Sequence, residues 1–221
     1  MTPRPAGAHT RSDGEPLSTG DEHLRSVDQV LRRLIDERGP IDPNSDRRAS
    51  RPDPYEALAR AIVGQQLSTK AARSIWDRLV ENLGGAFPPP ADLLAADPER
   101  IRGAGISRPK VGFLRDLAER VEDGRLDLAG LVELADEDVV AALTEIKGIG
   151  RWTAEMFLIF HLGRPDVIST GDLGIRRAVQ IAYGLDDLPG PTDLERIADP
   201  WRPHRTLACL YLWRSLDNAP V

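Results

Sequence analysis

Apolar residues recur along the chain at helical spacing. Two early examples are the sets Leu24, Val27, Val30, Leu31, Leu34 and Tyr55, Leu58, Ile62, Val63. Such spacing places apolar side chains on one face of a helix. No segment alternates apolar and polar residues convincingly with a period of two, as a half-buried strand would. The pattern predicts an all-α protein of about ten short helices.

Capping residues and prolines mark the ends of these helices. Asp53-Pro54 and Ser68 are typical helix starts, and Gly84-Gly85 ends the helix that Ser68 begins. Further starts are expected near Asp92, Ser107, Asp127, Asp136, Arg151, Asp172, Thr192 and Pro203. The Pro88-Pro89-Pro90 triplet is too short to separate two lobes, so we predict that it is a tight connector between helices rather than a hinge.

Residues 1–18 differ from the rest of the chain. They contain few apolar residues and many turn formers, which predicts a disordered tail. Residues 19–221 are predicted to form the folded domain. A chain of 221 residues is long enough for one sizeable core, or for two small lobes that share a cleft, without support from metals or disulfides.

Composition excludes several classes of protein. The single cysteine, Cys209, cannot form an internal disulfide or supply a multi-cysteine cluster, and it is typical of a reducing compartment. The four histidines show no metal-ligand spacing, so no metal is expected. No apolar stretch approaches a membrane span of about 18 residues, and the N-terminus lacks the apolar core of a signal peptide. We therefore expect a soluble, cytoplasmic protein with no membrane partner.

The formal net charge of −6 is unevenly distributed. Basic residues without any acid occupy the segment from Arg100 to Arg115, whereas acids concentrate between Glu133 and Glu145 and between Asp186 and Glu195. A bipolar surface of this kind can bind DNA with one face. A merely solvated helix face explains the basic segment equally well.

The most informative segment runs from Leu143 to Ala154. Gly148 and Gly150 separate two amphipathic stretches there and allow a turn too tight for side chains. The second helix then begins with free backbone N–H groups, which form an anion site. A similar glycine pair at Gly103 and Gly105 indicates either a second phosphate site or a plain turn.

Four motifs together carry a family resemblance. They are Ile146–Ala154, Gly171-Asp172, Ile62–Ser68 and Trp201-Arg202-Pro203. In this order and spacing they resemble the helix-hairpin-helix DNA glycosylase superfamily, and within it the 3-methyladenine DNA glycosylase II branch, over roughly residues 50–216. The resemblance implies two helical lobes with an active-site cleft between them. It also implies a DNA repair enzyme that flips alkylated purines out of double-stranded DNA and excises them.

The hairpin is expected to hold one DNA phosphate without regard to sequence. Backbone N–H groups around Gly150 and Arg151 would bind it, with help from the helix dipole, Lys147 and Thr153, while Gly148 shapes the turn. By resemblance, the hairpin carbonyls can also hold a monovalent cation against the phosphate. No other cofactor is expected.

Asp172 is the candidate catalytic residue. From its neighbours alone it is simply a good helix N-cap, because an apolar helical pattern follows it. The resemblance implies that it is also the carboxylate that stabilises an oxocarbenium-like sugar or positions the attacking water. The nearby Asp166 lies in an Arg-Pro-Asp turn and is expected to be structural.

Trp152 indicates the type of reaction. Relatives that also cut the DNA backbone carry a lysine nucleophile at this position, so an indole implies that water is the nucleophile and the product an abasic site. An indole can also stack on an extruded cationic base, although a core tryptophan is the alternative. Met156 and Trp201 are the other candidate pocket residues, Trp201 being equally compatible with the core. Tyr211 and Trp213 are assigned to the core.

The loop that follows Gly64 resembles the wedge that fills the gap left by a flipped nucleotide. Gln66 and Leu67 are the candidates for this role. Relatives have an apolar wedge where this chain has Gln66. Without the resemblance, Leu67 would be interpreted as core at a helix end.

The sequence thus predicts a monofunctional DNA-3-methyladenine glycosylase. We expect a monomer that is cytoplasmic and associates with the nucleoid when it acts. Two alternatives remain: a non-catalytic helix-hairpin-helix module that binds DNA, and a glycosylase for another lesion or with lyase activity.

Overall fold

The computed structural model describes residues 17–41 and 53–216. Within these ranges every regular element is helical, with twelve α-helices, two 3-10 helices and one π-helix. The chain divides into two compact units, one with described residues 17–41 and 163–216 and the other with residues 53–162. The all-α prediction and the prediction of two helical lobes are confirmed, and the helices are more numerous than expected.

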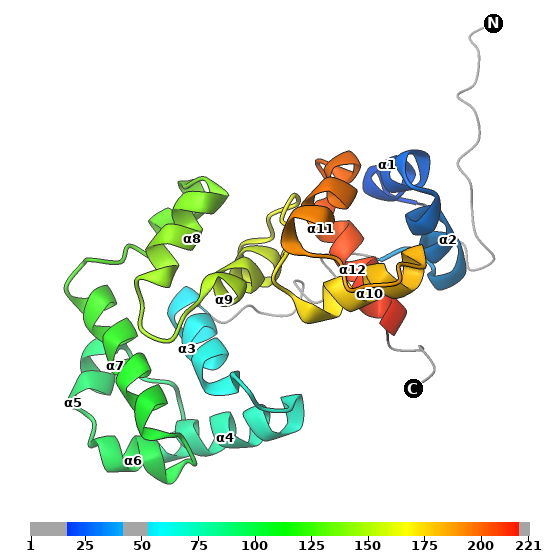
Figure 1. Cartoon of the computed structure of the whole chain (residues 1–221). Coiled ribbons are helices and arrows are strands. Elements are labelled where there is room, and N and C mark those ends of the chain that lie inside the picture. Colours follow the sequence, from blue (N-terminus) through cyan, green and yellow to red (C-terminus); the bar gives the residue numbers. More distant parts are fainter. Residues whose placement is uncertain (1–16, 42–52, 217–221) are drawn as a thin grey trace, which may run out of the picture. The chain divides into compact units, whose positions relative to one another are not determined.

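The first unit combines both ends of the described chain. Its elements are α1 (Thr19–Val27), α2 (Gln29–Arg38), α10 (Leu173–Tyr183), α11 (Pro191–Ala198), the 3-10 helix η3 (Asp199–Trp201) and α12 (Arg205–Leu216). Helices α1 and α2 pack against α12 (Figure 1). Ser18 begins α1 with a capping box that includes Asp21, and Asp28 caps α2.

Buried polar groups tie the N-terminal helices of this unit to its C-terminal part. The Tyr211 hydroxyl donates to Asp21 at 2.6 Å, and the Trp201 indole N–H donates to Asp28 at 2.8 Å. Both aromatic side chains are fully buried. Their polar atoms would be costly to bury without partners, so these two bonds specify how α1 and α2 pack.

The second unit is one continuous stretch of chain. Its elements are α3 (Pro54–Gly64), α4 (Thr69–Asn82), α5 (Pro90–Ala95), α6 (Pro98–Gly103), α7 (Arg108–Glu122), the 3-10 helix η1 (Gly130–Glu133), α8 (Asp136–Thr144), α9 (Arg151–Met156) and the π-helix η2 (Phe157–Leu162). The side chains of Asp53 and Ser68 cap α3 and α4 as predicted. Pro88 and Pro89 lie between α4 and α5, and Pro90 begins α5, all inside this unit, so the predicted connector between helices is confirmed.

Some predicted boundaries were wrong or untested. Helix α6 was not expected, and near Asp127 the chain forms only the 3-10 helix η1. The Asp127 carboxylate accepts from the backbone N–H groups of Ala129 and Gly130. Of the predicted tail, residues 1–16 lie outside the described residues, whereas Ser18 caps α1. Within 17–41 and 53–216 no helix is both long and apolar enough for a membrane span.

Candidate functional site

The predicted hairpin lies between α8 and α9. Ile146 and Ile149 are buried and anchor the turn in the second unit, and the Ile149 N–H donates to the Ile146 carbonyl at 3.0 Å. Gly150 is the N-cap of α9, and no side chain accepts from the first turn of that helix. The backbone N–H groups of this turn are therefore not satisfied by a capping side chain, as an anion site requires.

The two glycines of the hairpin serve different purposes. Gly148 has a φ of +85°, and a Cβ there would lie 2.2 Å from the Phe113 ring. Gly150 has a φ of −98°, and a Cβ there would meet no atom within 4 Å. Gly148 is therefore required by the turn and its packing, whereas Gly150 keeps the surface open above the helix start.

Asp116 of α7 contacts the hairpin through Lys147. Its carboxylate accepts from the Lys147 backbone N–H at 3.0 Å, and it pairs with the Lys147 ammonium at 3.2 Å and the Arg120 guanidinium at 3.1 Å. Burial by itself raises the pKa of Asp116, but the hydrogen bonds from Lys147 and Arg120 outweigh it, so the pKa lies below its ordinary value. The Lys147 side chain remains mostly exposed.

Two of the residues predicted to bind the phosphate have side chains that are ion-paired or buried. The Arg151 guanidinium pairs with Glu137 and with Glu155, and its hydrogen bond lowers the pKa of Glu137. Thr153 is buried, so its hydroxyl does not reach a ligand at the surface. The predicted contribution of the Thr153 side chain was therefore wrong, whereas the prediction for Arg151 concerned its backbone N–H. At the start of α9, Arg151 and Thr153 can still donate their backbone N–H groups to an anion.

Trp152 is not a core residue. Its side chain is 48% exposed, although an indole this large is usually mostly buried. Met156, one turn further along α9, is half-buried. The hairpin therefore presents an indole, with no lysine, at the position that the resemblance associates with the nucleophile of lyases.

Asp172 begins α10 in the first unit. Its Oδ1 accepts from the Ile175 backbone N–H at 2.7 Å, so the predicted N-cap is confirmed. The indole N–H of Trp213 donates to the same oxygen at 3.1 Å. Asp172 is 8% exposed, and these two donors orient its carboxylate.

Two further residues, Trp213 and Gly174, lie next to Asp172 and were not predicted from the sequence to do so. Trp213 was assigned to the core, but it is half-buried and bonded to Asp172. At Gly174 a Cβ would lie 3.0 Å from the Asp172 Oδ1 and 3.3 Å from the Trp213 ring. The glycine two residues after the carboxylate was the available signal, whereas nothing in the sequence links position 213 to position 172.

Trp201 was wrongly predicted to line the base pocket. It is fully buried, and its N–H is bonded to Asp28, so it belongs to the core of the first unit. The assignment of Tyr211 to the core is confirmed. Asp166 has the structural role expected of it, because it pairs with Arg202 and Arg205.

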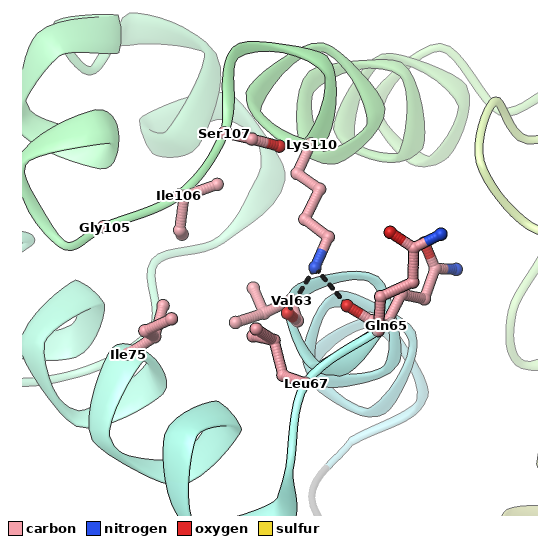
Figure 2. A pocket seen from close by; sticks show the side chains of 9 residues that line it. Val63, Gln65, Leu67, Ile75, Gly105, Ile106, Ser107 and Lys110 are labelled. Atoms are coloured by element: carbon pink, nitrogen blue, oxygen red, sulfur yellow. Dashed lines mark hydrogen bonds between the residues drawn. The ribbon is translucent and has the colours of Figure 1, made fainter.

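The loop between α3 and α4 contacts both the hairpin and α7. The Gln65 side-chain amide donates to the Gly148 carbonyl at 2.7 Å. The Lys110 ammonium donates to the carbonyls of Val63 at 2.8 Å and Gln65 at 2.6 Å (Figure 2). Between these contacts, Gln66 has a left-handed backbone with a φ of +59° and an exposed side chain. Leu67 is 38% exposed.

Neither the second glycine pair nor any group of possible metal ligands gives a further candidate site among the described residues. At the second glycine pair, the Arg78 guanidinium donates to the Ala104 carbonyl at 3.0 Å, which braces a turn between α6 and α7. Among residues 17–41 and 53–216, no group of three or more histidine, cysteine, aspartate or glutamate side chains could hold a metal ion.

Comparison with known proteins places this geometry in a family. Residues 59–203 match the model of the HhH-GPD superfamily of base excision DNA repair proteins. The chain belongs to this superfamily. DNA is therefore the class of partner, as the hairpin predicted.

Relatives and solved structures agree with the assignment. The chain is 37% identical to DNA-3-methyladenine glycosylase 1 of Schizosaccharomyces pombe, over 90% of this chain and 87% of the relative. It is similar to the crystal structure of a DNA-3-methyladenine glycosidase from Bacillus halodurans, with a TM-score of 0.81, 38% identity, and coverage of 91% and 90% of the two chains. It is also similar to the S. pombe glycosylase Mag1 in complex with abasic DNA, with a TM-score of 0.77, 35% identity, and coverage of 91% and 98%.

Proposed function

We propose that this protein is a monofunctional DNA glycosylase that excises alkylated purines of the 3-methyladenine type from double-stranded DNA and leaves an abasic site. The observation that carries the proposal is the oriented carboxylate of Asp172, which follows a hairpin that presents Trp152 instead of a lysine. The names of the relatives, DNA-3-methyladenine glycosylase and glycosidase, support this substrate class.

The hairpin is proposed to anchor the enzyme on the DNA backbone. The N–H groups at the start of α9 would bind one phosphate, the open surface above Gly150 would let the backbone approach, and Lys147 would add charge. Such contacts carry no base information. The enzyme would therefore hold damaged and undamaged DNA in the same way until a base leaves the stack.

Gln66 is proposed as the side chain that fills the gap left by the flipped nucleotide. Gln66 lies just after the end of α3 and has a left-handed backbone conformation. Its side chain is exposed. Leu67, the other candidate, is 38% exposed and has no comparable backbone conformation. A plug offsets part of the unstacking cost, which is about a few kcal/mol.

Trp152 and Met156 are proposed to contact the flipped base. The exposed indole offers a face on which a base can stack. An N-alkylated purine carries positive charge, so cation–π attraction would favour it over a normal base by about 0.5–2 kcal/mol. Because the charged base leaves as a neutral molecule, its departure would not require protonation by a strong acid.

Asp172 is proposed to act on the sugar. As the bond between C1′ and the base nitrogen breaks, its electron pair goes to the base and positive charge develops on the sugar. The carboxylate would stabilise this charge and position a water whose oxygen forms the new bond to C1′ and whose proton is released. The donors Ile175 N–H and Trp213 N–H keep the carboxylate oriented before the substrate arrives.

Further expectations concern the enzyme's surroundings. A monovalent cation at the hairpin would be held by backbone carbonyls between Thr144 and Gly150, a suitable type of ligand, although the Gly148 carbonyl already accepts from Gln65. The ion would help to hold the phosphate. We further propose that the enzyme works as a cytoplasmic monomer that associates with the nucleoid.

Release of free base from methylated duplex DNA tests the function. The wild type should release 3-methyladenine, detected by chromatography, and Asp172→Asn should bind the same DNA without release. No release by the wild type, in an assay where a known glycosylase succeeds, would overturn the proposal and favour a non-catalytic DNA-binding module. A covalent adduct trapped with borohydride would overturn the monofunctional mechanism.

A further inference from the structure

The loop that carries Gln66 lies beside a surface pocket. A cavity of about 210 Å³ lies beside it, between the loop, α4 and the start of α7. Its lining residues are Val63, Gln65, Gln66, Leu67, Ile75, Gly105, Ile106, Ser107 and Lys110 (Figure 2). Polar contacts on either side of this pocket help to determine the shape of the loop.

Lys110 supplies such contacts. Its side chain extends from α7 to the end of α3 and donates to the carbonyls of Val63 and Gln65, at 2.8 and 2.6 Å (Figure 2). These carbonyls lie at the C-terminal end of α3, where a cation interacts favourably with the helix dipole. Both bonds are charge-assisted and therefore stronger than bonds between neutral groups. Burial lowers the pKa of Lys110, in keeping with an ammonium that points into the protein.

The contacts on either side of Gln66 hold a conformation that its own backbone disfavours. A φ of +59° is uncommon for a residue with a side chain. Lys110 holds the carbonyl just before Gln66, and the Leu67 N–H just after it donates to the Gly64 carbonyl at 3.2 Å. The Gln65 amide connects the same loop to the hairpin through the Gly148 carbonyl.

We propose that Lys110 is a positioning residue for base flipping. It holds the loop in the conformation in which Gln66 projects from the surface, at a fixed place relative to the hairpin. Lys110 itself contacts neither the reacting sugar nor the base. The inference rests on the proposed role of Gln66 as the plug.

A double-mutant cycle tests this inference by single-turnover excision from DNA with one alkylated purine. Lys110→Met keeps most of the side chain and removes the three N–H donors, and Gln66→Ala removes the plug. Each should slow excision on the order of 10- to 100-fold, since each removes part of the compensation for unstacking. The double variant should be hardly slower than Gln66→Ala alone, because Lys110 then has nothing to position. Lys110→Arg, which keeps charged donors, should recover part of the rate.

A matched control separates positioning from simple loss of charge. Arg108→Met removes one positive charge from the first turn of the same helix. It should weaken DNA binding slightly, by loss of charge, and leave the rate at saturating enzyme unchanged. Unfolding followed by circular dichroism checks that the variants fold. If Lys110→Met does not fold, Lys110→Gln, which retains a single donor group, takes its place in the cycle.

The outcomes distinguish the two proposals. If the losses from Lys110→Met and Gln66→Ala simply add, or if Arg108→Met slows excision as much as Lys110→Met, the positioning role is overturned. If Gln66→Ala leaves the rate unchanged, the plug assignment fails, and the positioning role that depends on it fails too. Base release by the wild type establishes the proposed function independently of either result.

Discussion

The starts of α9 and α10 solve the same physical problem in opposite ways. Every helix begins with backbone N–H groups that lack partners and with the positive end of its dipole. At α9 the N-cap is Gly150, and no side chain accepts from the first turn. At α10 the N-cap is Asp172, whose carboxylate accepts from Ile175 at 2.7 Å.

In the proposed function, the two helix starts would serve two different steps. The start of α9 is suited to bind an anion that DNA supplies, and the start of α10 orients an anion that the protein supplies. The supports differ as well. Ion pairs at Asp116 hold the hairpin, whereas the backbone N–H of Ile175 and the indole N–H of Trp213 donate to Asp172.

Removing the charge at α10 should have the largest effect. Asp172→Asn keeps a side chain that can cap the helix but lacks the negative charge, so excision should slow by at least about 10²- to 10³-fold. Affinity for DNA should be retained or increase. Single-turnover excision and fluorescence anisotropy measure the two. Asp187→Asn, at an exposed position of the same unit, is the matched control. Normal excision by Asp172→Asn would contradict the catalytic role.

Substitutions at the two hairpin glycines should affect different properties, stability at Gly148 and DNA binding at Gly150. Gly148→Ala introduces a side chain at a positive φ and against Phe113, so it should lower the free energy of unfolding by about 2–4 kcal/mol. Gly150→Val fits the fold but covers the start of α9, so it should weaken binding to all DNA sequences alike. Urea unfolding and binding to several duplexes check both. Unequal losses between sequences at Gly150→Val would show that the hairpin reads bases.

The ion pairs beneath the hairpin should contribute to stability in a pH-dependent way. Asp116→Asn should lower the free energy of unfolding near neutral pH by about 1.5–3 kcal/mol, because a buried acceptor of charged donors is lost. The folded pKa of Asp116 lies below its ordinary value of 3.8, so its contribution is present above that value and disappears as pH falls towards the folded pKa. Thermal unfolding should therefore show the two proteins converging below about pH 4. A gap that widens in acid would contradict this account.

Removing the indole donor at α10 should have the smallest effect. Trp213→Phe keeps a ring in place and removes one hydrogen bond to Asp172, which is worth about 1 kcal/mol. Excision should slow several-fold, through kcat rather than KM, because the carboxylate is less well oriented. Single-turnover kinetics measure this change, and an unchanged rate would reduce Trp213 to a packing residue.

The sequence predicted those parts of the site that depend on neighbours in the chain. The cap at Asp172 joins residues three apart, and the glycine turn before α9 is a local feature. The error at Trp201 has a different origin. The residue that buries its polar atom, Asp28, lies 173 positions away. Local pattern cannot show which side chains meet across such a distance.

By itself the sequence determined the all-helical class, most helix starts, the hairpin and the family, because hydrophobic periodicity, capping and turn geometry act over a few residues. Tertiary structure decided which glycine the fold requires, which cations are already paired, and what holds Asp172 and the loop at Gln66. Phe113, Glu137, Trp213 and Lys110 reach these places only through folding. Their contacts depend on packing between distant segments, which short-range spacing does not encode.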